Sequence, residues 1–123
     1  MGDDYSTDVW ISEQASAVLA KFLRKTRAKG KEFIAKVEHY AEKGFGKYES
    51  SGGPIRHEGN HVFRIGQTNS LFRLIGFYAS GKSEFICMDG FTKRGKELSR
   101  PQRERITQVA KIRKQQSWVR QPS

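Results

Sequence analysis

Apolar positions follow a helical period in the first third of the chain and a strand period in its middle third. After a short alternating stretch at 7–13, interpreted as a strand, the pattern predicts a helix that opens near Ser12 and is punctuated at Gly30. A second helix is predicted over 31–43, and two glycines just beyond it end that helix. The two amphipathic helices are interpreted as an αα-hairpin that lies across a sheet.

Four short strands follow, and they are predicted at 55–58, 61–67, 71–78 and 83–90. Turn-forming pairs separate them, namely Gly59-Asn60, Asn69-Ser70 and Ser80-Gly81. Such short connections join antiparallel neighbours, so the strands should form an antiparallel meander.

A last helix, running to about residue 116, is predicted from the spacing of Ile106, Val109 and Ala110. The fold class is therefore α+β, with the N-terminal αα-hairpin and its helices on one face of a small antiparallel sheet. At 123 residues the chain is expected to form one domain over 1–123, with mobile ends at 1–6 and 117–123.

Positive charge is concentrated at the C-terminal end. Residues 91–123 carry ten Lys/Arg and two Glu, a net of +8, out of a formal +10 for the whole chain. A strongly basic protein is suited to nucleic acid, an anionic membrane surface or an acidic protein as partner.

Membrane and export functions have no support in the sequence. No run of about 18 apolar residues is present, so no membrane-spanning helix is expected. The acidic N-terminus lacks an apolar signal segment, which favours a cytoplasmic location. The single Cys87 lies in an apolar run and is interpreted as a buried, inert thiol.

Basic residues stand where apolar strands are interrupted or end. Arg64 and Arg73 fall in the middle of two neighbouring strands, while Lys93 and Arg94 follow the apolar run Phe85–Met88. One interpretation is that the arginines are structural and pair with a carboxylate, such as Glu58 or Glu84. The other interpretation, which we favour, is that four basic residues converge to form a positively charged surface that binds a phosphate. These residues are Arg64, Arg73, Lys93 and Arg94.

The segment His57-Glu58-Gly59-Asn60-His61 matches the H-E-x-x-H pattern of zinc proteases. That chemistry requires both histidines on one face of a helix, and Gly59-Asn60 favours a hairpin turn instead. We therefore predict no metal site. The two histidines are either part of a solvated hairpin or lie on the open face of the sheet, where one could act on a phosphate or a base.

Three segments, taken in order, carry a family resemblance: Val62-Phe-Arg-Ile-Gly66, Leu71-Phe-Arg-Leu-Ile-Gly-Phe-Tyr78 and Phe85-Ile-Cys-Met-Asp-Gly-Phe-Thr-Lys-Arg94. Together with the preceding αα-hairpin they resemble the RelE/ParE toxin superfamily, and its HigB-like, phage-related branch in particular. The chain differs from that branch at Asp89, where a histidine is common, and at Arg94, where a second lysine is usual.

The resemblance implies a RelE-like fold and the toxin of a type II toxin–antitoxin system, an mRNA endoribonuclease that acts in the ribosome. It implies a cognate antitoxin, often with a helix-turn-helix, that forms a hetero-oligomer with the toxin. It places Arg64, Arg73, Lys93 and Arg94 at the family's basic active-site positions. No cofactor is expected.

Cleavage of RNA without a metal requires groups that stabilise charge and a group that transfers protons. The arginines would stabilise the phosphorane, and Lys93 among like charges could have its pKa lowered enough to act as acid or base. Contacts to RNA are expected from a further set: Lys96, Arg100, Arg103, His57 and His61. The alternatives are a non-cleaving toxin of the same fold that acts on DNA gyrase, and a basic nucleic-acid-binding module without catalysis.

Overall fold

The computed structural model describes residues 6–66, 71–80, 83–93, 95 and 97–115. The ends predicted to be mobile, 1–6 and 117–123, lie outside these ranges except for Ser6, and so does the predicted turn Asn69-Ser70.

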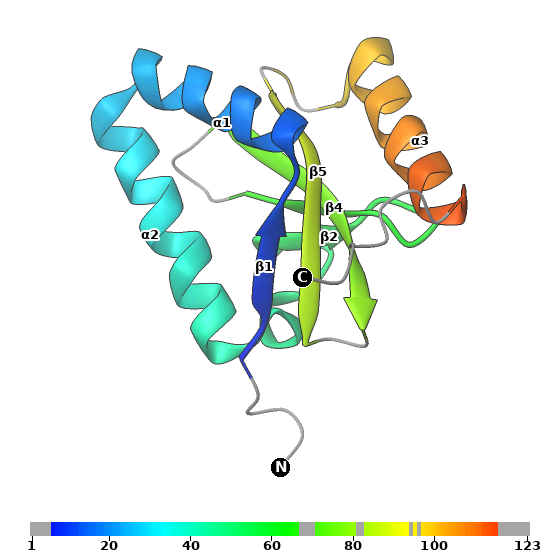
Figure 1. Cartoon of the computed structure of the whole chain (residues 1–123). Helices are drawn as coiled ribbons and strands as arrows, with labels where there is room; N and C mark the ends of the chain where they lie inside the picture. The colour runs from blue at the N-terminus through cyan, green and yellow to red at the C-terminus, as the bar shows by residue number, and fades with distance from the viewer. Residues whose placement is uncertain (1–5, 67–70, 81–82, 94, 96, 116–123) are drawn as a thin grey trace.

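The elements in chain order are β1 (Asp8–Ile11), α1 (Glu13–Lys25), α2 (Arg27–Lys43), the 3₁₀ helix η2 (Phe45–Tyr48), β2 (Ile55–His57), β3 (Phe63–Ile65), β4 (Phe72–Ser80), β5 (Glu84–Thr92) and α3 (Arg100–Gln115). The five strands form one sheet in the order β1-β5-β4-β3-β2 (Figure 1). The predicted α+β class is confirmed.

The sheet is mixed, which corrects the prediction of an antiparallel meander. β2 to β5 are antiparallel neighbours, but β1 pairs in parallel with β5, with Asp8 opposite Glu84 and Ile11 opposite Cys87. The αα-hairpin therefore follows a strand of the sheet and does not itself open the fold. The alternating pattern at 7–13 predicts a strand but carries no information on its partner, which is why this pairing was missed.

The break between α1 and α2 lies at Thr26 and not at the predicted Gly30. The Thr26 amide and hydroxyl both donate to the carbonyl of Phe22, at 3.0 and 2.9 Å, and this ends α1. Gly30 lies inside α2, where an added Cβ would come within 2.5 Å of Leu23 Cδ2. Gly30 thus allows the two helices to approach closely. The predicted start near Ser12 is confirmed, since its hydroxyl accepts a hydrogen bond from the Ala15 amide.

Helices cover both faces of the sheet, which corrects the prediction that they lie on one face (Figure 1). α1 and α2 pack on one face, where Phe33 and Tyr40 meet Phe72 and Leu74. On the other face α3 packs against β4 and β5. Its apolar residues cover a separate buried cluster, formed by Val62 just before β3 and by Ile75, Phe77, Ile86 and Phe91 of β4 and β5. Strands β4 and β5 carry apolar residues on both faces of the sheet. Helices must therefore pack on each face to keep these residues from water.

Cys87 is fully buried in β5, as predicted, and burial raises the pKa of its thiol to about 12. No helix among the described residues is long and apolar enough to cross a membrane.

Candidate phosphate-binding site

Three arginines meet on the α3 side of the sheet, next to its β2 edge. The β2–β3 hairpin places Arg56 opposite Arg64, and the next pairing places Arg64 opposite Ile75. Residues that face each other across neighbouring strands share a face, and so do residues two apart in one strand. Arg73, two residues before Ile75 in β4, therefore joins the other two arginines.

Arg64 is the buried member of the group, with 5% of its surface exposed. Its Nε lies 2.7 Å from Glu58 Oε2, but the N–H is not directed at that oxygen. As a result Nε and Nη1 are both buried and have no hydrogen-bond partner among the residues that the structure describes. Burial lowers the pKa of Arg64 and so does the charge of Arg56, while Glu58 opposes both. Arginine nevertheless remains a cation.

This ion pair confirms part of the structural interpretation, in which Arg64 pairs with Glu58. The other suggested carboxylate, Glu84, lies elsewhere and accepts a hydrogen bond from the indole of Trp10 at 3.2 Å. Among the described residues, the charge of Glu58 offsets only part of the charge of the three arginines. Arg64 is therefore both paired and able to donate hydrogen bonds.

Arg73 lies flat across Gly66, the residue that follows β3. An added Cβ at Gly66 would come within 2.4 to 2.8 Å of Cδ, Nε and Cζ of Arg73. The Arg73 Nη1 donates to the carbonyl of Phe72 at 2.8 Å. Burial is the main cause that lowers the pKa of Arg73, and the charges of Arg64 and Arg56 add to it. Gly66 thus provides the space that holds this guanidinium beside the others.

Lys93 follows the last residue of β5, and its amide donates to the carbonyl of Leu71 at 2.7 Å. The pKa of its amine is lowered, first by burial and then by the charges of Arg64, Arg73 and Arg56. The predicted direction of this shift is confirmed, although like charge is not its largest cause. The structure thus brings three of the four predicted catalytic residues together. The fourth, Arg94, lies outside the described residues.

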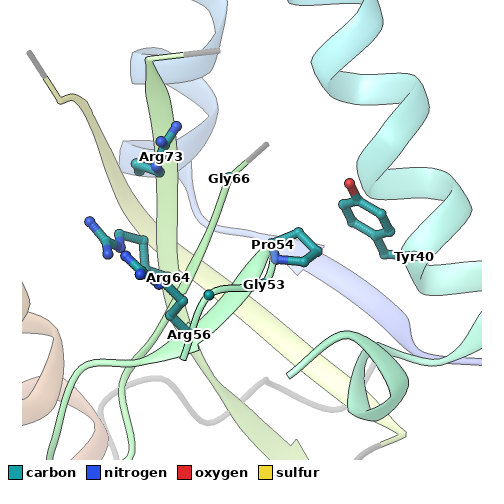
Figure 2. A pocket seen from close by; sticks show the side chains of 8 residues that line it. Tyr40, Gly53, Pro54, Arg56, Arg64, Gly66 and Arg73 are labelled. Atoms are coloured by element: carbon teal, nitrogen blue, oxygen red, sulfur yellow. The ribbon is translucent and has the colours of Figure 1, made fainter. Parts of the chain in front are cut away.

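The arginines line a pocket with a volume of about 260 Å³ (Figure 2). One wall is formed by Arg56, Arg64 and Arg73, and Tyr40 of α2 stands across Pro54 from them. The remaining described lining residues are Gly52, Gly53, Pro54 and Gly66. The described lining includes no carboxylate. Such a pocket is suited to an anion that accepts several hydrogen bonds, as a phosphate does.

The predicted RNA-contacting residues of the C-terminal part lie apart from this pocket. Arg100 and Arg103 are exposed at the start of α3, where Arg100 pairs with Glu104 at 3.4 Å and Arg103 donates to the Leu98 carbonyl at 2.7 Å. Neither is part of the described lining. Lys96 lies outside the described residues.

The two histidines belong to a hairpin, which confirms the rejection of the zinc-protease pattern. His57 ends β2, and Gly59, Asn60 and His61 all have positive φ, at 95°, 52° and 65°. No helix can contain three such residues. His57 is exposed and its ring lies 5.0 Å from that of Phe63, which packs toward the core under α1 and α2. This places His57 on the face opposite to the arginines, while His61 is exposed in the turn.

Asp89 stands where the HigB-like branch commonly has a histidine. It links three elements of the fold. Its Oδ1 accepts hydrogen bonds from Arg105 of α3 at 2.9 Å, from Gln14 of α1 at 3.3 Å and from the Gly90 amide at 2.8 Å. The contacts of Asp89 are those of a structural residue.

Two residues of the pocket were missed by the sequence analysis. Arg56 could have been found, because the Gly59-Asn60 turn sets a hairpin register in which Arg56 faces Arg64. Tyr40 could not. Its helical spacing predicts a core residue, which it is with 9% exposure, and only the packing of α2 brings it to the edge of the pocket.

Replacing Gly66 by alanine should move the Arg73 side chain aside and leave the fold intact, because the atoms in conflict are the far end of a flexible side chain. We expect affinity for inorganic phosphate to fall several-fold, with a melting temperature close to that of the parent. Gly46→Ala is the matched control, since an added Cβ there meets nothing within 4 Å. Equal phosphate affinities in the two variants would contradict this role of Gly66.

Comparison with protein-family models, with curated proteins and with solved structures finds no match in any of the three.

Proposed function

We propose that the protein is a metal-independent endoribonuclease that cleaves mRNA in the ribosome, the toxin of a type II toxin–antitoxin pair. The observation that carries the proposal is the convergence of Arg56, Arg64, Arg73 and Lys93. Four cations meet there, Glu58 pairs with Arg64, and two buried nitrogens of Arg64 have no hydrogen-bond partner among the described residues. A bound phosphate would supply the missing acceptors and offset the repulsion among the cations.

The same groups suit the chemistry of RNA cleavage. The 2′-oxygen loses its proton and attacks phosphorus, the bond to the 5′-oxygen breaks, and the 5′-oxygen takes up a proton. The products are a 2′,3′-cyclic phosphate and a 5′-hydroxyl. Arg64 and Arg73 would stabilise the charge that develops on the phosphorane. Lys93, with its lowered pKa, is the group here that is best suited to exchange a proton, whereas the arginines remain protonated.

The biological role rests on the resemblance to the RelE/ParE toxins. Arg64, Arg73 and Lys93 stand in the family's order along the chain and meet in one place in the structure. A toxin of this kind would act in the cytoplasm, on mRNA in the ribosomal A site. It would be held inactive in a hetero-oligomer with an antitoxin, which is frequently a helix-turn-helix protein.

Induced expression in bacteria tests the proposal. We expect growth arrest and new mRNA ends within open reading frames that are being translated. Arrest with intact mRNA and damaged DNA would instead indicate an action on gyrase. Absence of toxicity, together with salt-sensitive RNA binding, would indicate a module that binds without cleaving.

Lys93→Arg is the sharpest variant, because it keeps the positive charge and replaces an amine that can lose its proton by a guanidinium that stays protonated. We expect cleavage to fall by about 10²-fold or more, the contribution of a positioned acid or base. Affinity for a 2′-O-methyl RNA, which cannot be cleaved, should change little. Cleavage by Lys93→Arg at the parental rate would exclude Lys93 from proton transfer and leave it a role in binding alone.

A further inference from the structure

The pocket extends beyond the space that a phosphate fills. Its arginine wall accounts for one side, but the cavity of about 260 Å³ continues over Pro54 to Tyr40 (Figure 2). That volume is just below the roughly 300–1,000 Å³ of pockets that enclose drug-sized ligands. There is room for one small group attached to the phosphate, and not for a folded stretch of nucleic acid.

The far side of the pocket has the chemistry of a base-binding site. Pro54 contributes an apolar ring to the lining, and Gly52 and Gly53 carry no side chains that would fill the space. Tyr40 is nine-tenths buried and its ring lies 4.6 Å from that of Tyr48, which fixes its position. Its hydroxyl makes no hydrogen bond to the described residues. Burial, and then Tyr48, raise the pKa of Tyr40, so the hydroxyl keeps its proton and can donate it.

The pocket walls are held in place by backbone hydrogen bonds. The Gly66 amide donates to the Pro54 carbonyl at 2.8 Å, and the Ser50 amide donates to the Ile55 carbonyl at 3.1 Å. The Arg56 Nε also donates to the Ser51 carbonyl at 2.6 Å. The 50–54 loop is thereby tied to the strands that carry the arginines. A ligand would meet a preformed site and would lose little free energy in ordering it.

We infer that this pocket is a subsite for one unpaired nucleotide of an RNA chain, with its phosphate on Arg64 and Arg73 and its base between Pro54 and Tyr40. Two observations carry the inference independently. The first is the pair of buried Arg64 nitrogens that lack a hydrogen-bond acceptor among the described residues. The second is the extension of the same cavity past Pro54 to Tyr40, which an inorganic anion would leave empty.

This inference rests on the proposed function and specifies its substrate. A base can enter the pocket only if it is unstacked from its neighbours, so the site would select single-stranded RNA. The Tyr40 hydroxyl would contact the edge of the base and would discriminate among the four bases.

Binding of small ligands tests the inference without reference to cleavage. The probes are inorganic phosphate, ribose 5-phosphate, the four nucleoside 3′-monophosphates and a 2′-O-methyl trinucleotide, with affinities measured by calorimetry. We expect at least one nucleoside monophosphate to bind roughly tenfold or more tightly than ribose 5-phosphate, the gain of stacking one base. The trinucleotide should bind at least as tightly as that monophosphate.

Two variants locate the base within the pocket. Tyr40→Phe keeps the ring and its packing, and it should reduce the preference among bases about three- to tenfold, the effect of one lost hydrogen bond. Gly52→Leu places a side chain where an added Cβ meets nothing within 4 Å, and it should remove the advantage over ribose 5-phosphate. Gly46→Leu, equally unobstructed but outside the described lining, is the control. Phosphate affinity should be the same in all three.

The inference is overturned if nucleoside monophosphates bind no more tightly than ribose 5-phosphate. It is equally overturned if both pocket variants keep the full advantage, because the base would then lie elsewhere. A monophosphate that binds while the trinucleotide does not would show that the ligand is a free nucleotide and not a chain. None of these outcomes depends on mRNA cleavage in cells, so a failure of the proposed function would be recognised separately.

Discussion

Replacing Arg73 by alanine is expected to lower the rate of RNA cleavage by about 10²–10³-fold, the effect of removing one preorganised donor from a developing oxyanion. Arg73 lies across Gly66 at the pocket wall, and its charge adds to that of Arg64 and Arg56 in lowering the pKa of Lys93. Its removal therefore costs a phosphate contact and also raises the pKa of Lys93 toward its ordinary value. Cleavage of a model mRNA on programmed ribosomes, followed as a single turnover, measures the loss.

The Arg73→Ala variant tests the role of the arginine site in cleavage more directly than an Arg64→Ala variant would. Truncation of Arg64 would leave Glu58 beside a new cavity, and a loss of activity could then reflect a loss of stability. Arg73 is half-buried and its far end lies across Gly66, where no side chain is packed beneath it, so its truncation should leave the melting temperature nearly unchanged. Arg24→Ala removes the same charge from an exposed position on α1 and should cleave at close to the parental rate. Equal losses in the two variants would mean that net charge, and not the site, controls cleavage.

Replacing Phe72 by alanine should lower the free energy of unfolding by about 3–5 kcal/mol, which is a large part of the roughly 5–15 kcal/mol that stabilises a typical domain. Phe72 is 1% exposed and joins three elements. Its ring stacks on Phe22 of α1 at 4.5 Å and meets Phe33 of α2 edge-on at 5.4 Å. Its loss would remove the aromatic contacts that join β4 to both helices of the αα-hairpin. Urea denaturation followed by circular dichroism measures the change.

The neighbouring residue provides a matched control for this prediction. Leu71 is 55% exposed, so Leu71→Ala should change the free energy of unfolding by no more than about 0.5 kcal/mol. A loss below about 1.5 kcal/mol in Phe72→Ala would show that α1 and α2 are held to the sheet mainly by other contacts.

Local features of the fold could be predicted because they depend on neighbouring residues. The Ser12 cap fixes the start of α1, and the Gly59-Asn60 pair fixes the β2–β3 hairpin, since glycine and asparagine tolerate the positive φ that the turn requires. The same turn was sufficient to reject a metal-binding helix at His57 and His61. Gly30 was misassigned because a glycine that ends a helix and a glycine that allows two helices to pack look alike in a sequence.

Long-range pairing could not be predicted. Nothing in residues 7–13 indicates that β1 lies parallel to β5, because any strand with an exposed edge could accept it. The placement of α3 likewise depends on the tertiary structure. Both faces of β4 and β5 are apolar, and α3 covers the face that α1 and α2 leave open.

The sequence by itself determined that basic residues interrupt two neighbouring strands and follow a third, because charge and periodicity are properties of the chain. Only the tertiary structure decided what those residues do together. Pairing across β2, β3 and β4 added Arg56 to the cluster, buried Arg64 against Glu58 and put the Arg73 guanidinium over Gly66. It also excluded His57 from the cluster by placing it on the other face. Electrostatic coupling depends on distance in space, and the order of residues along a chain does not specify that distance.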